Sequence, residues 1–457
     1  MPKTPTSTIN RRQFIHYSTF AAGAAFASGP FLLRGRNLND KLNVAVIGAN
    51  GKGASDTDGV AGTGQNIVAI CDIDEKNLDE RGAKYPAAKR YRDYRKMLEA
   101  EKNIDAVTVS TPDHHHAFAS MMAIKLHRNV YCQKPLTHSI FEARALTEAA
   151  RKYKVATMMG NQGHSSSRVR TFAEMIWAGA IGKVREVHCW TDRPIWPQGL
   201  TRPKDVQPVP ANVDWDMFIG PAPMRPYHSG YQPFAWRGWW DFGTGALGDM
   251  ACHVMDPANF TLQLANPTSV EAQQEGNTEE SGPKWSIIRY EFPRRHAVKN
   301  LGGENVSPTD YALGPVSLTW YDGGKKPSAD LMGLAAGEKM PDNGSLFVGD
   351  DGVMFCETYG EGPRFVGKSK GKVFPTPAET IARAPGHYEE FVRACKGGVP
   401  AGSNFNYAGP FTEIVLLGNL AVRSGKKIEW DSKKLKAKNA PELDHLIHRQ
   451  YRSGWSL

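Results

Sequence analysis

A glycine-bearing turn at residues 42–53 constrains the fold of this chain more than any other feature. The stretch reads LNVAVIGANGKG, so a short apolar, β-branched run leads directly into Gly48, Gly51 and Gly53. Glycines in such a turn let the backbone approach a pyrophosphate closely. Asn50 stands where the G-x-G-x-x-G pattern has its middle glycine, and we expect the turn to persist because asparagine tolerates a positive φ. An ordinary strand-to-helix turn would leave a similar pattern.

The next apolar run supports a dinucleotide-binding unit. Residues 66–70 predict a second strand that ends at Cys71-Asp72, and Asp72 follows Gly48 by 24 residues. A dinucleotide-binding unit places a carboxylate near this position to accept hydrogen bonds from a ribose. Such a carboxylate would also repel a 2′-phosphate, so the pattern predicts NAD as the cofactor and disfavours NADP.

Strand-like and helix-like segments alternate between residues 42 and 159. The predicted strands are 42–47, 66–71, 104–109, 129–132 and 155–159, and the predicted helices are 52–61, 75–84, 114–127 and 139–153. This alternation is typical of an α/β fold with helices on both faces of a parallel sheet. We therefore predict an NAD-binding Rossmann domain over residues 40–163.

The pattern changes after Gly160. A predicted helix at 168–178 and a Pro- and Trp-rich passage at 194–240 accompany separated strands at 184–190, 285–292, 316–320 and 346–348. Separated strands of this kind indicate a mostly antiparallel sheet. Residues 164–457 are thus predicted to form an α+β domain for substrate binding and dimerisation. We expect helices at 388–394 and 411–422 to pack back against the body, and the chain to form a homo-oligomer.

The first 37 residues predict an export signal and linker. Arg11-Arg12 precede a weakly apolar stretch at 20–27, in which Ala25-Phe26-Ala27 offers a cleavage site. This order resembles a twin-arginine signal peptide, which implies a periplasmic or otherwise exported protein, tethered if the signal stays attached. A disordered extension with a chance arginine pair is the alternative. No other segment has the ~20 apolar residues that a membrane span needs.

Charge and cysteine content exclude several classes of partner. The formal net charge of +9 is dispersed, and its densest run, at 433–438, is typical of a solvated surface, so nucleic acid is not an expected partner. The six cysteines are scattered without a C-x-x-C pair. Neither a metal site nor a disulfide framework is therefore indicated.

Polar residues follow the third and fourth predicted strands. Ser110, Thr111 and Pro112 lie at the carboxyl end of one strand, where open α/β sheets place ligands, and His116 falls in the next helical turn. His116 is the last of three adjacent histidines, which point in different directions from a helix start, so we expect no metal there.

Lys134 follows the next strand, within Gln133-Lys134-Pro135. Beside a cofactor, desolvation would help it exchange a proton near neutral pH, although a solvated loop lysine is the commoner case.

A carboxylate and an imidazole are spaced four residues apart near position 250. Asp249 and His253 would share one face of a helix, so the carboxylate could orient the imidazole and stabilise its protonated form. The alternative is that the two residues form an ordinary pair on an exposed helix face, which has the same four-residue spacing and no catalytic role. Trp236 and Arg237 directly precede this segment and suit a sugar-like ligand, although core packing explains most tryptophans equally well. His164 could reach the substrate or satisfy backbone groups in a loop.

Together these residues resemble the glucose-fructose oxidoreductase, inositol dehydrogenase and MocA (Gfo/Idh/MocA) family of oxidoreductases. The resemblance spans residues 42–425 and includes the glycine turn, Thr111-Pro112 with His116, Lys134-Pro135, and the segment GTGALGDMACH that ends at His253. In the family, the lysine of a Glu-Lys-Pro motif contacts substrate and nicotinamide, and an Asp-x-x-x-His pair completes the catalytic set. The resemblance therefore implies these roles for Lys134, Asp249 and His253. Gln133 replaces the usual glutamate, which removes a negative charge beside Lys134.

The combined expectation is an NAD-dependent oxidoreductase that moves a hydride between the cofactor and a secondary hydroxyl of a sugar, sugar derivative or cyclitol. Export limits access to free NAD, which keeps open an alternative with no net redox change. In that alternative, a glycoside hydrolase oxidises, eliminates and re-reduces one sugar with a retained cofactor. A sugar-binding or sensing protein on an inactive scaffold is disfavoured because Lys134, Asp249 and His253 are all present.

Overall fold

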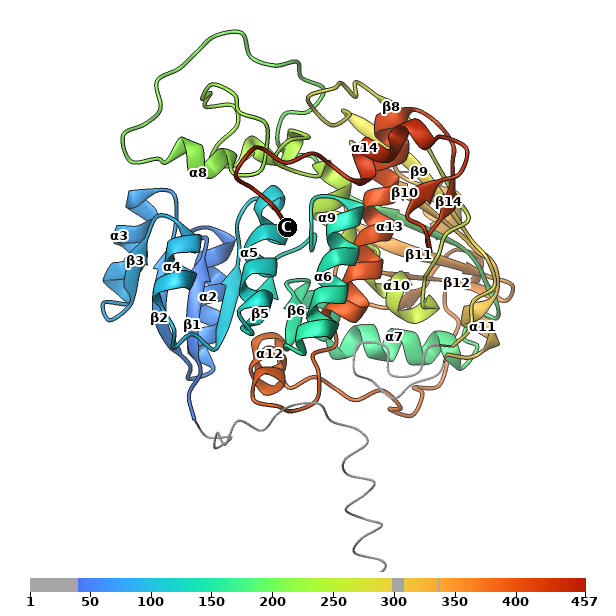
Figure 1. The fold of residues 1–457 in the computed structure, drawn as a ribbon. Helices are drawn as coiled ribbons and strands as arrows, with labels where there is room; N and C mark the ends of the chain where they lie inside the picture. The colour runs from blue at the N-terminus through green and yellow to red at the C-terminus, as the bar shows by residue number, and fades with distance from the viewer. Residues whose placement is uncertain (1–39, 298–307, 336) are drawn as a thin grey trace, which may run out of the picture. The chain divides into compact units, whose positions relative to one another are not determined.

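Two β-sheets organise the chain from Lys41 onward. The structure is a computed structural model that describes residues 40–297, 308–335 and 337–457, and Lys41–Leu457 form one unit (Figure 1). The predicted export signal at residues 1–37 lies outside the described residues. Within the described ranges, no helix is both long enough and apolar enough to cross a membrane.

The first sheet contains six parallel strands in the order β3-β2-β1-β4-β5-β6. They are β1 (Asn43–Ile47), β2 (Asn66–Cys71), β3 (Lys89–Tyr91), β4 (Ala106–Val109), β5 (Asn129–Cys132) and β6 (Thr157–Met159). The strand order reverses between β1 and β4, and open parallel sheets bind ligands at such a switch point, outside the carboxyl ends of the strands. The predicted α/β class with a Rossmann sheet is confirmed.

Helices connect these strands, and their first turns show the expected capping. They are α2 (Lys52–Gly62), α3 (Glu75–Lys84), α4 (Tyr94–Ala100), α5 (Asp113–Lys125) and α6 (Ile140–Tyr153). The Asp74 carboxylate accepts a hydrogen bond from the Lys76 N–H at 2.9 Å and so caps α3, and Ser139 forms a capping box with Glu142 on α6. The short elements β3 and α4 are absent from the sequence prediction.

The second sheet contains nine strands within the described residues, in the order β13-β12-β11-β7-β10-β9-β8-β14-β15. They are β7 (Val184–Trp190), β8 (Ser269–Glu275), β9 (Trp285–Phe292), β10 (Val316–Tyr321), β11 (Gly344–Gly349), β12 (Gly352–Cys356), β13 (Arg364–Phe365), β14 (Ile428–Asp431) and β15 (Lys436–Ala437). Its neighbouring strands are antiparallel except for the parallel pair β7 and β10. The prediction of a mostly antiparallel second sheet is confirmed.

The second half of the chain contains eight α-helices within the described residues. They are α7 (Ser167–Trp177), α8 (Trp215–Ile219), α9 (Gly245–Val254), α10 (Asp256–Leu262), α11 (Asp310–Leu313), α12 (His387–Cys395), α13 (Phe405–Ser424) and α14 (Asp444–Ile447). Helix α13 lies beside α6 (Figure 1), where the Arg144 guanidinium donates two hydrogen bonds of 2.7 Å to Glu413. Helix α13 begins at Phe405 and continues through Pro410, whereas the sequence suggested a start at residue 411. One hydrophobic core cluster contains residues of both sheets, among them Val107 and Leu318.

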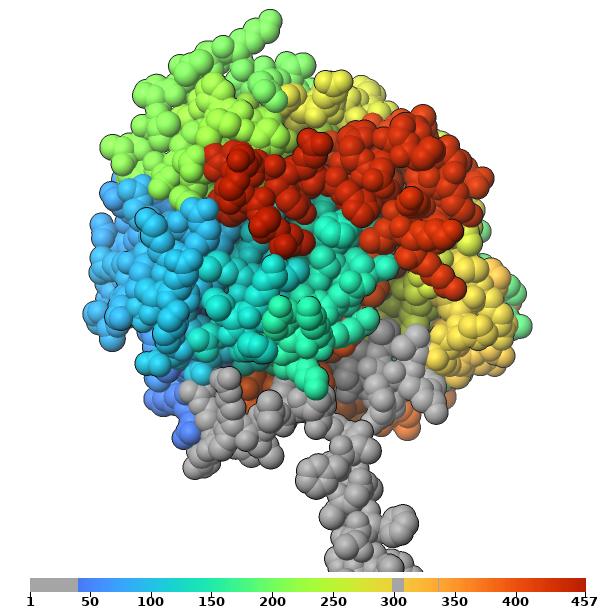
Figure 2. Space-filling model, viewed as in Figure 1, coloured from blue at the N-terminus to red at the C-terminus, as the bar shows by residue number. Residues whose placement is uncertain are grey.

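The last residues of the chain cross the surface of the first half. In Figure 2 this red segment lies over the teal helices α5 and α6. The half-buried Trp455 ring packs edge-on against Tyr94 and Phe118, with ring centroids 6.3 and 5.7 Å apart, and the Arg95 guanidinium lies 4.7 Å from its centroid. Arg449 donates to the buried Glu142 carboxylate at 2.7 Å. These contacts attach the segment to α4, α5 and α6.

We expect Trp455→Ala to lower the free energy of unfolding by about 2 kcal/mol, because it removes a half-buried ring from an aromatic cluster. Urea unfolding followed by circular dichroism measures the change. Val373→Ala is the control, since Val373 is 90 % exposed and should change the stability very little. Equal unfolding midpoints for the two variants would contradict this account of the C-terminal segment.

Candidate active site

Lys134, Asp249 and Arg237 meet where the first sheet faces α9. Lys134 follows β5, and its ammonium donates to Asp249 Oδ1 at 2.9 Å and to the Asp249 backbone carbonyl at 2.6 Å. Arg237 lies in the passage before α9 and donates from Nε to the same Oδ1 at 3.2 Å. The side chains of Lys134 and Asp249 are 15 % and 14 % exposed. The structure thus brings together three residues that are up to 115 positions apart in sequence.

Burial and neighbouring cations set the charge states at this site. Burial alone would raise the pKa of Asp249, but Lys134 and Arg237 more than offset it and hold the pKa below its usual value. For His253, burial and then the Lys134 charge lower the pKa to about 3, against the weaker opposite effect of Asp249. His253 is therefore neutral near pH 7. Asp249 favours the protonated form of His253, as the sequence suggested, but burial and the Lys134 charge outweigh this effect.

His253 has an unused ring nitrogen. The residue is 6 % exposed and lies one helical turn beyond Asp249 on α9. Its Nδ1 is buried, and no described residue forms a hydrogen bond with it. A buried polar atom without a partner needs an explanation, and its place one helical turn from Asp249 makes this nitrogen a candidate for contact with a ligand.

The glycine loop after β1 has the geometry of a nucleotide cradle. Gly48 and Gly51 have φ angles of 87° and 56°, so the positive φ values fall on glycines, whereas the sequence suggested that Asn50 would have to tolerate one. A Cβ at Gly53 would lie 2.0 Å from the Gly48 carbonyl oxygen, which explains the tight packing of the loop on α2. A Cβ at Gly51 would meet no atom within 4 Å, so space lies open beside the first turn of α2. Helix N-termini with open N–H groups bind phosphates.

Asp72 sits at the end of β2 with its carboxylate fixed by the backbone. It accepts hydrogen bonds from the N–H groups of Ala49 at 2.8 Å and Asp74 at 2.9 Å, and from the Asn77 amide at 3.2 Å. Burial raises its pKa despite these hydrogen bonds. The Asn50 side chain donates to Asn77 and links the glycine loop to this corner. A fixed carboxylate beside an open glycine loop fits the ribose and pyrophosphate of NAD, which these residues would hold.

The residues after β4 occupy different positions around the crevice. Ser110 donates from its hydroxyl to Asp56 at 2.8 Å, while Thr111 and Pro112 are half-buried at the strand end. Burial lowers the pKa of His116, but Cys132, Asp113 and the Pro135 carbonyl reverse this and raise it to about 9. Its two ring nitrogens lie 2.9 and 2.8 Å from the Thr111 and Pro135 carbonyl oxygens. His116 therefore braces the segments that follow β4 and β5, and its contact with the cofactor stays a prediction.

The other two adjacent histidines on α5 also contact backbone carbonyls, one of which they share. His114 lies within hydrogen-bonding distance of the Phe242 and Phe218 carbonyl oxygens, at 3.2 and 2.8 Å, and His115 approaches the Phe218 carbonyl at 3.0 Å. Burial lowers the pKa of His115 to about 4. These histidines join the start of α5 to the aromatic core of the 191–244 passage.

His164 is buried and pairs with a carboxylate of α10. It is 1 % exposed, and its Nδ1 is 3.0 Å from Asp256 Oδ2. Asp256 also accepts from Tyr407 at 2.7 Å and from Asn161 at 3.1 Å. The histidine belongs to a buried network that joins α10 and α13 to the end of β6, and its contact with substrate stays a prediction.

Arg237 is held by aromatic rings beside the ion pair. Its guanidinium lies 4.3 Å from the ring centroid of Trp236 and 4.6 Å from that of Phe234. Trp236 is 9 % exposed and serves mainly to position Arg237, whereas Phe234 is 46 % exposed. The Phe234 ring is thus accessible to a ligand, although the sequence analysis did not predict Phe234 as a substrate-binding residue. All seven tryptophans between 177 and 240 are at most 9 % exposed, which confirms core packing for these rings.

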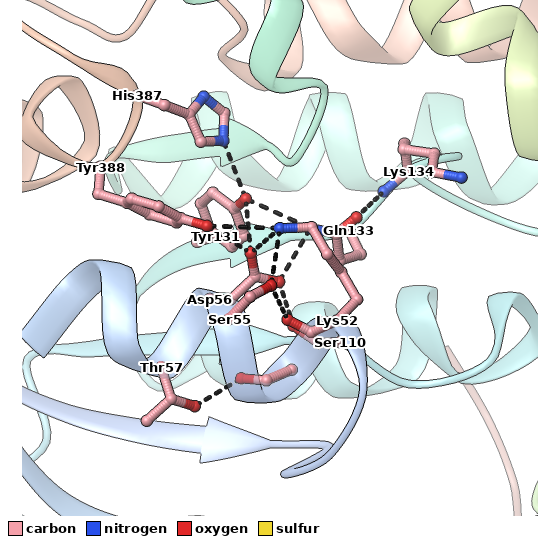
Figure 3. Close-up of polar contacts among 11 residues, drawn as sticks. Lys52, Ser55, Asp56, Thr57, Ser110, Tyr131, Gln133, Lys134, His387 and Tyr388 are labelled. Atoms are coloured by element: carbon pink, nitrogen blue, oxygen red, sulfur yellow. Dashed lines mark hydrogen bonds and ion pairs between the residues drawn. The ribbon is translucent and has the colours of Figure 1, made fainter.

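Two buried carboxylates near the site were missed from the sequence. Asp113 accepts a hydrogen bond from Thr244 at 2.6 Å and so ties α5 to the start of α9, and burial raises its pKa. Asp56 on α2 accepts from side chains of several elements (Figure 3). An aspartate inside a predicted helix carries no sequence signal of this kind, because its partners come from distant segments.

Comparison with known families agrees with this geometry. Residues 42–161 match the family model described as oxidoreductase family, NAD-binding Rossmann fold, and residues 183–319 match that of the oxidoreductase family, C-terminal alpha/beta domain. Both models describe the Gfo/Idh/MocA family. The chain belongs to this family of NAD-binding oxidoreductases.

Curated relatives are sugar and cyclitol dehydrogenases. The chain is 29 % identical to D-apiose dehydrogenase of Paraburkholderia graminis over 268 residues, which cover 56 % of this chain and 61 % of that protein. It is 26 % identical to myo-inositol 2-dehydrogenase of Thermotoga maritima over 164 residues, which cover 36 % of this chain and 47 % of that protein. The matched regions thus span about half of each of these relatives.

Solved structures share the fold at low sequence identity. The WlbA dehydrogenase of Bordetella pertussis, in complex with NADH and UDP-GlcNAcA, aligns with a TM-score of 0.60 and 14 % identity over 86 % of this chain and 99 % of that one. A levoglucosan dehydrogenase in complex with NADH aligns with a TM-score of 0.53 and 16 % identity over 85 % and 98 % of the two chains. These likenesses support the two-sheet fold.

Because the pKa of His253 is low, we expect the protein to lose stability in acid, and we expect His253→Gln to lose less. Unfolded histidine gains a proton below pH 6.5, but folded His253 stays neutral down to about pH 3, so protonation favours the unfolded state between these values. Between pH 6.5 and 5, the wild type should lose about 2 kcal/mol more unfolding free energy than His253→Gln. Urea titrations at both pH values test this, with His445→Gln as the exposed control. If His253→Gln lost as much unfolding free energy between pH 6.5 and 5 as the wild type, this prediction would be wrong.

Asp72→Ala should weaken NADH binding roughly tenfold and NADPH binding much less, since only the first loses a charged hydrogen bond to its ribose. Fluorescence titration with both nucleotides measures the two dissociation constants. Asp79→Ala on α3 is the control, because Asp79 is exposed and pairs with Arg90 at the surface. An equal loss for both nucleotides, or a wild type that prefers NADPH, would refute the assignment.

Proposed function

We propose that this protein is an NAD-dependent oxidoreductase that acts on a secondary hydroxyl of a sugar, sugar derivative or cyclitol. The observation that carries the proposal is the Lys134–Asp249–Arg237 cluster, with neutral His253 one helical turn away, at the carboxyl end of a Rossmann sheet. Residues 40–163 would bind the cofactor and residues 164–457 the substrate. When bound, NAD supplies a hydride acceptor in the oxidation direction.

Two residues divide the proton chemistry in this proposal. We assign proton acceptance from the substrate hydroxyl to His253, because the ring is neutral near pH 7 and no described residue forms a hydrogen bond with its Nδ1. Lys134 donates a hydrogen bond to the same oxygen and stabilises the negative charge that develops there. Asp249 fixes the Lys134 side chain because it accepts two hydrogen bonds from the ammonium, one at its carboxylate Oδ1 and one at its backbone carbonyl.

The substrate class follows from Arg237 and its aromatic neighbours. A guanidinium donates to hydroxyl groups, and an exposed aromatic ring such as Phe234 packs on the apolar face of a sugar ring. The names of the relatives support a polyhydroxylated substrate, because they include D-apiose and myo-inositol dehydrogenases. We extend the proposal to export by the twin-arginine route, on the basis of Arg11-Arg12 and the apolar stretch that follows.

A substrate panel tests the proposed activity. Purified protein is incubated with NAD and a set of aldoses, cyclitols and aryl glycosides, while absorbance at 340 nm and released aglycone are recorded. Stoichiometric NADH with at least one sugar or cyclitol is the expected result. Release of aglycone without net NADH would instead indicate the redox-neutral hydrolase, and binding without any turnover would indicate a sensing protein.

Lys134→Met should lower kcat/KM about 1,000-fold, since the developing charge on the substrate oxygen loses its fixed cation. NADH binding and the unfolding midpoint should change far less than the rate. Lys426→Met is the matched control, because Lys426 is 54 % exposed and pairs with Glu442 at the surface. A Lys134→Met enzyme with more than a tenth of the wild-type kcat/KM would exclude this role.

A further inference from the structure

Asp56 is a fully buried carboxylate at the centre of a converging set of donors. The residue is 0 % exposed in the second turn of α2. Its oxygens contact five side chains: Lys52 at 2.5 Å, Ser110 at 2.8 Å, Gln133 at 2.9 Å, Tyr388 at 2.9 Å and Tyr131 at 3.3 Å (Figure 3). Burying a carboxylate is unfavourable unless donors replace its water. So many donors on one side chain indicate a specific structural requirement at this point.

The donors come from α2, from α12 and from the carboxyl ends of β4 and β5. Lys52 is the first residue of α2, directly after the glycine loop, and Ser110 follows β4. Tyr131 lies on β5 and Tyr388 on α12. The Tyr388 ring packs so closely on α2 that a Cβ at Gly59 would lie only 2.1 Å from it. Asp56 therefore joins the helix that begins at the glycine loop to two strand ends and to a helix from the second half.

Gln133 connects this carboxylate to the candidate active site. Its amide donates to Asp56 Oδ2 at 2.9 Å, and it directly precedes Lys134 in the chain. Figure 3 shows the Lys134 side chain extending away from the Asp56 cluster, where it reaches Asp249. Residues 133 and 134 are thus held from opposite sides, one by Asp56 and the other by Asp249. A shift of Gln133 would displace the backbone that carries Lys134.

The amide at position 133 is matched to the carboxylate at position 56. Gln133 is 4 % exposed, so water cannot replace Asp56 as the hydrogen-bond partner of its side chain. A glutamate at 133 would bring two carboxylates to about the same 2.9 Å separation, and two such groups cannot both stay ionised. The sequence reading treated Gln133 only as the loss of a charge beside Lys134. In the structure, its amide instead supplies a donor to Asp56.

We propose that Asp56 is a positioning residue that couples cofactor binding to the catalytic lysine. Through Lys52 it fixes the first turn of α2, and through Gln133 it fixes the segment that carries Lys134. This inference rests on the proposed function for its catalytic half, while the cofactor-binding half stands on the glycine loop alone. The charged and titratable groups that face the Asp56 cluster are Lys52 from α2, Tyr131 from β5, and Tyr388 and His387 from α12, where His387 Nε2 lies 2.9 Å from the Tyr131 hydroxyl.

A charge exchange tests the match between the two positions. Gln133→Glu should weaken NADH binding about tenfold and lower kcat about 100-fold at pH 8, because a small displacement of a catalytic group has effects of this size. Both losses should diminish at pH 6, where the two carboxylates can share a proton. The double variant Asp56→Asn/Gln133→Glu restores one donor and one acceptor and should return both quantities to within about threefold of wild type at pH 8.

Control variants separate positioning from a general effect on folding. Asp58→Asn makes the same substitution two residues further along α2, where the carboxylate is 39 % exposed, and should leave NADH binding and kcat unchanged. Tyr388→Phe removes one peripheral donor and keeps the test usable if Gln133→Glu does not fold. It should weaken NADH binding about threefold, as expected for the loss of one hydrogen bond.

Three results would overturn the proposal. They are wild-type behaviour of Gln133→Glu at pH 8, a double variant no better than Gln133→Glu, or a loss of thermal stability that is the same at pH 6 and pH 8 with NADH binding and kcat unaffected. If no sugar or cyclitol is oxidised by the wild type, the proposed function fails. The NADH dissociation constants and their pH dependence then still decide whether Asp56 organises the cofactor site.

Discussion

The ion pair between Lys134 and Asp249 determines how the two sheets of this protein meet at the candidate site. Lys134 comes from the end of a parallel strand, and Asp249 comes from the helix that covers the crevice. Both side chains are about 85 % buried, and a buried charge is unfavourable unless a partner is close. The position of α9 over the first sheet therefore depends on this contact. Arg237 extends it to the aromatic passage, because it donates to the same carboxylate oxygen.

Burial acts on every titratable group at the site, and local partners decide the outcome. His253 faces the positive charge of Lys134, so its pKa falls to about 3 and the ring stays neutral. His116 is equally buried, but Cys132, then Asp113 and the Pro135 carbonyl oxygen outweigh burial and raise its pKa. Equal burial therefore accompanies a neutral ring at His253 and a protonated ring at His116, because their neighbours differ. Sequence spacing alone does not distinguish these cases.

Local sequence predicted most of the Rossmann half because its elements are long and strongly patterned. The missed elements depend on tertiary contacts. Strand β3 has three residues and β13 has two, and each is defined by pairing with a neighbouring strand. Helix α13 continues through Pro410, where packing against α6 and β8 outweighs the lost backbone hydrogen bond. In the site, the glycine loop, Asp72, Lys134 and the Asp249–His253 segment were recognisable, whereas Asp56, Asp113 and Phe234 were not.

The sequence by itself determined the main alternation of strands and helices in the first half, the glycine turn and the residue types available for chemistry, because these follow from local periodicity and from side-chain chemistry. Only the tertiary structure decided which of them act together. Asp249 binds Lys134 and Arg237 rather than orienting His253. His164 belongs to a buried network with Asp256. The Gln133 amide donates a hydrogen bond to Asp56. The reason is that hydrogen bonds and charge states depend on distances of about 3 Å. Such distances arise when segments far apart in sequence pack together.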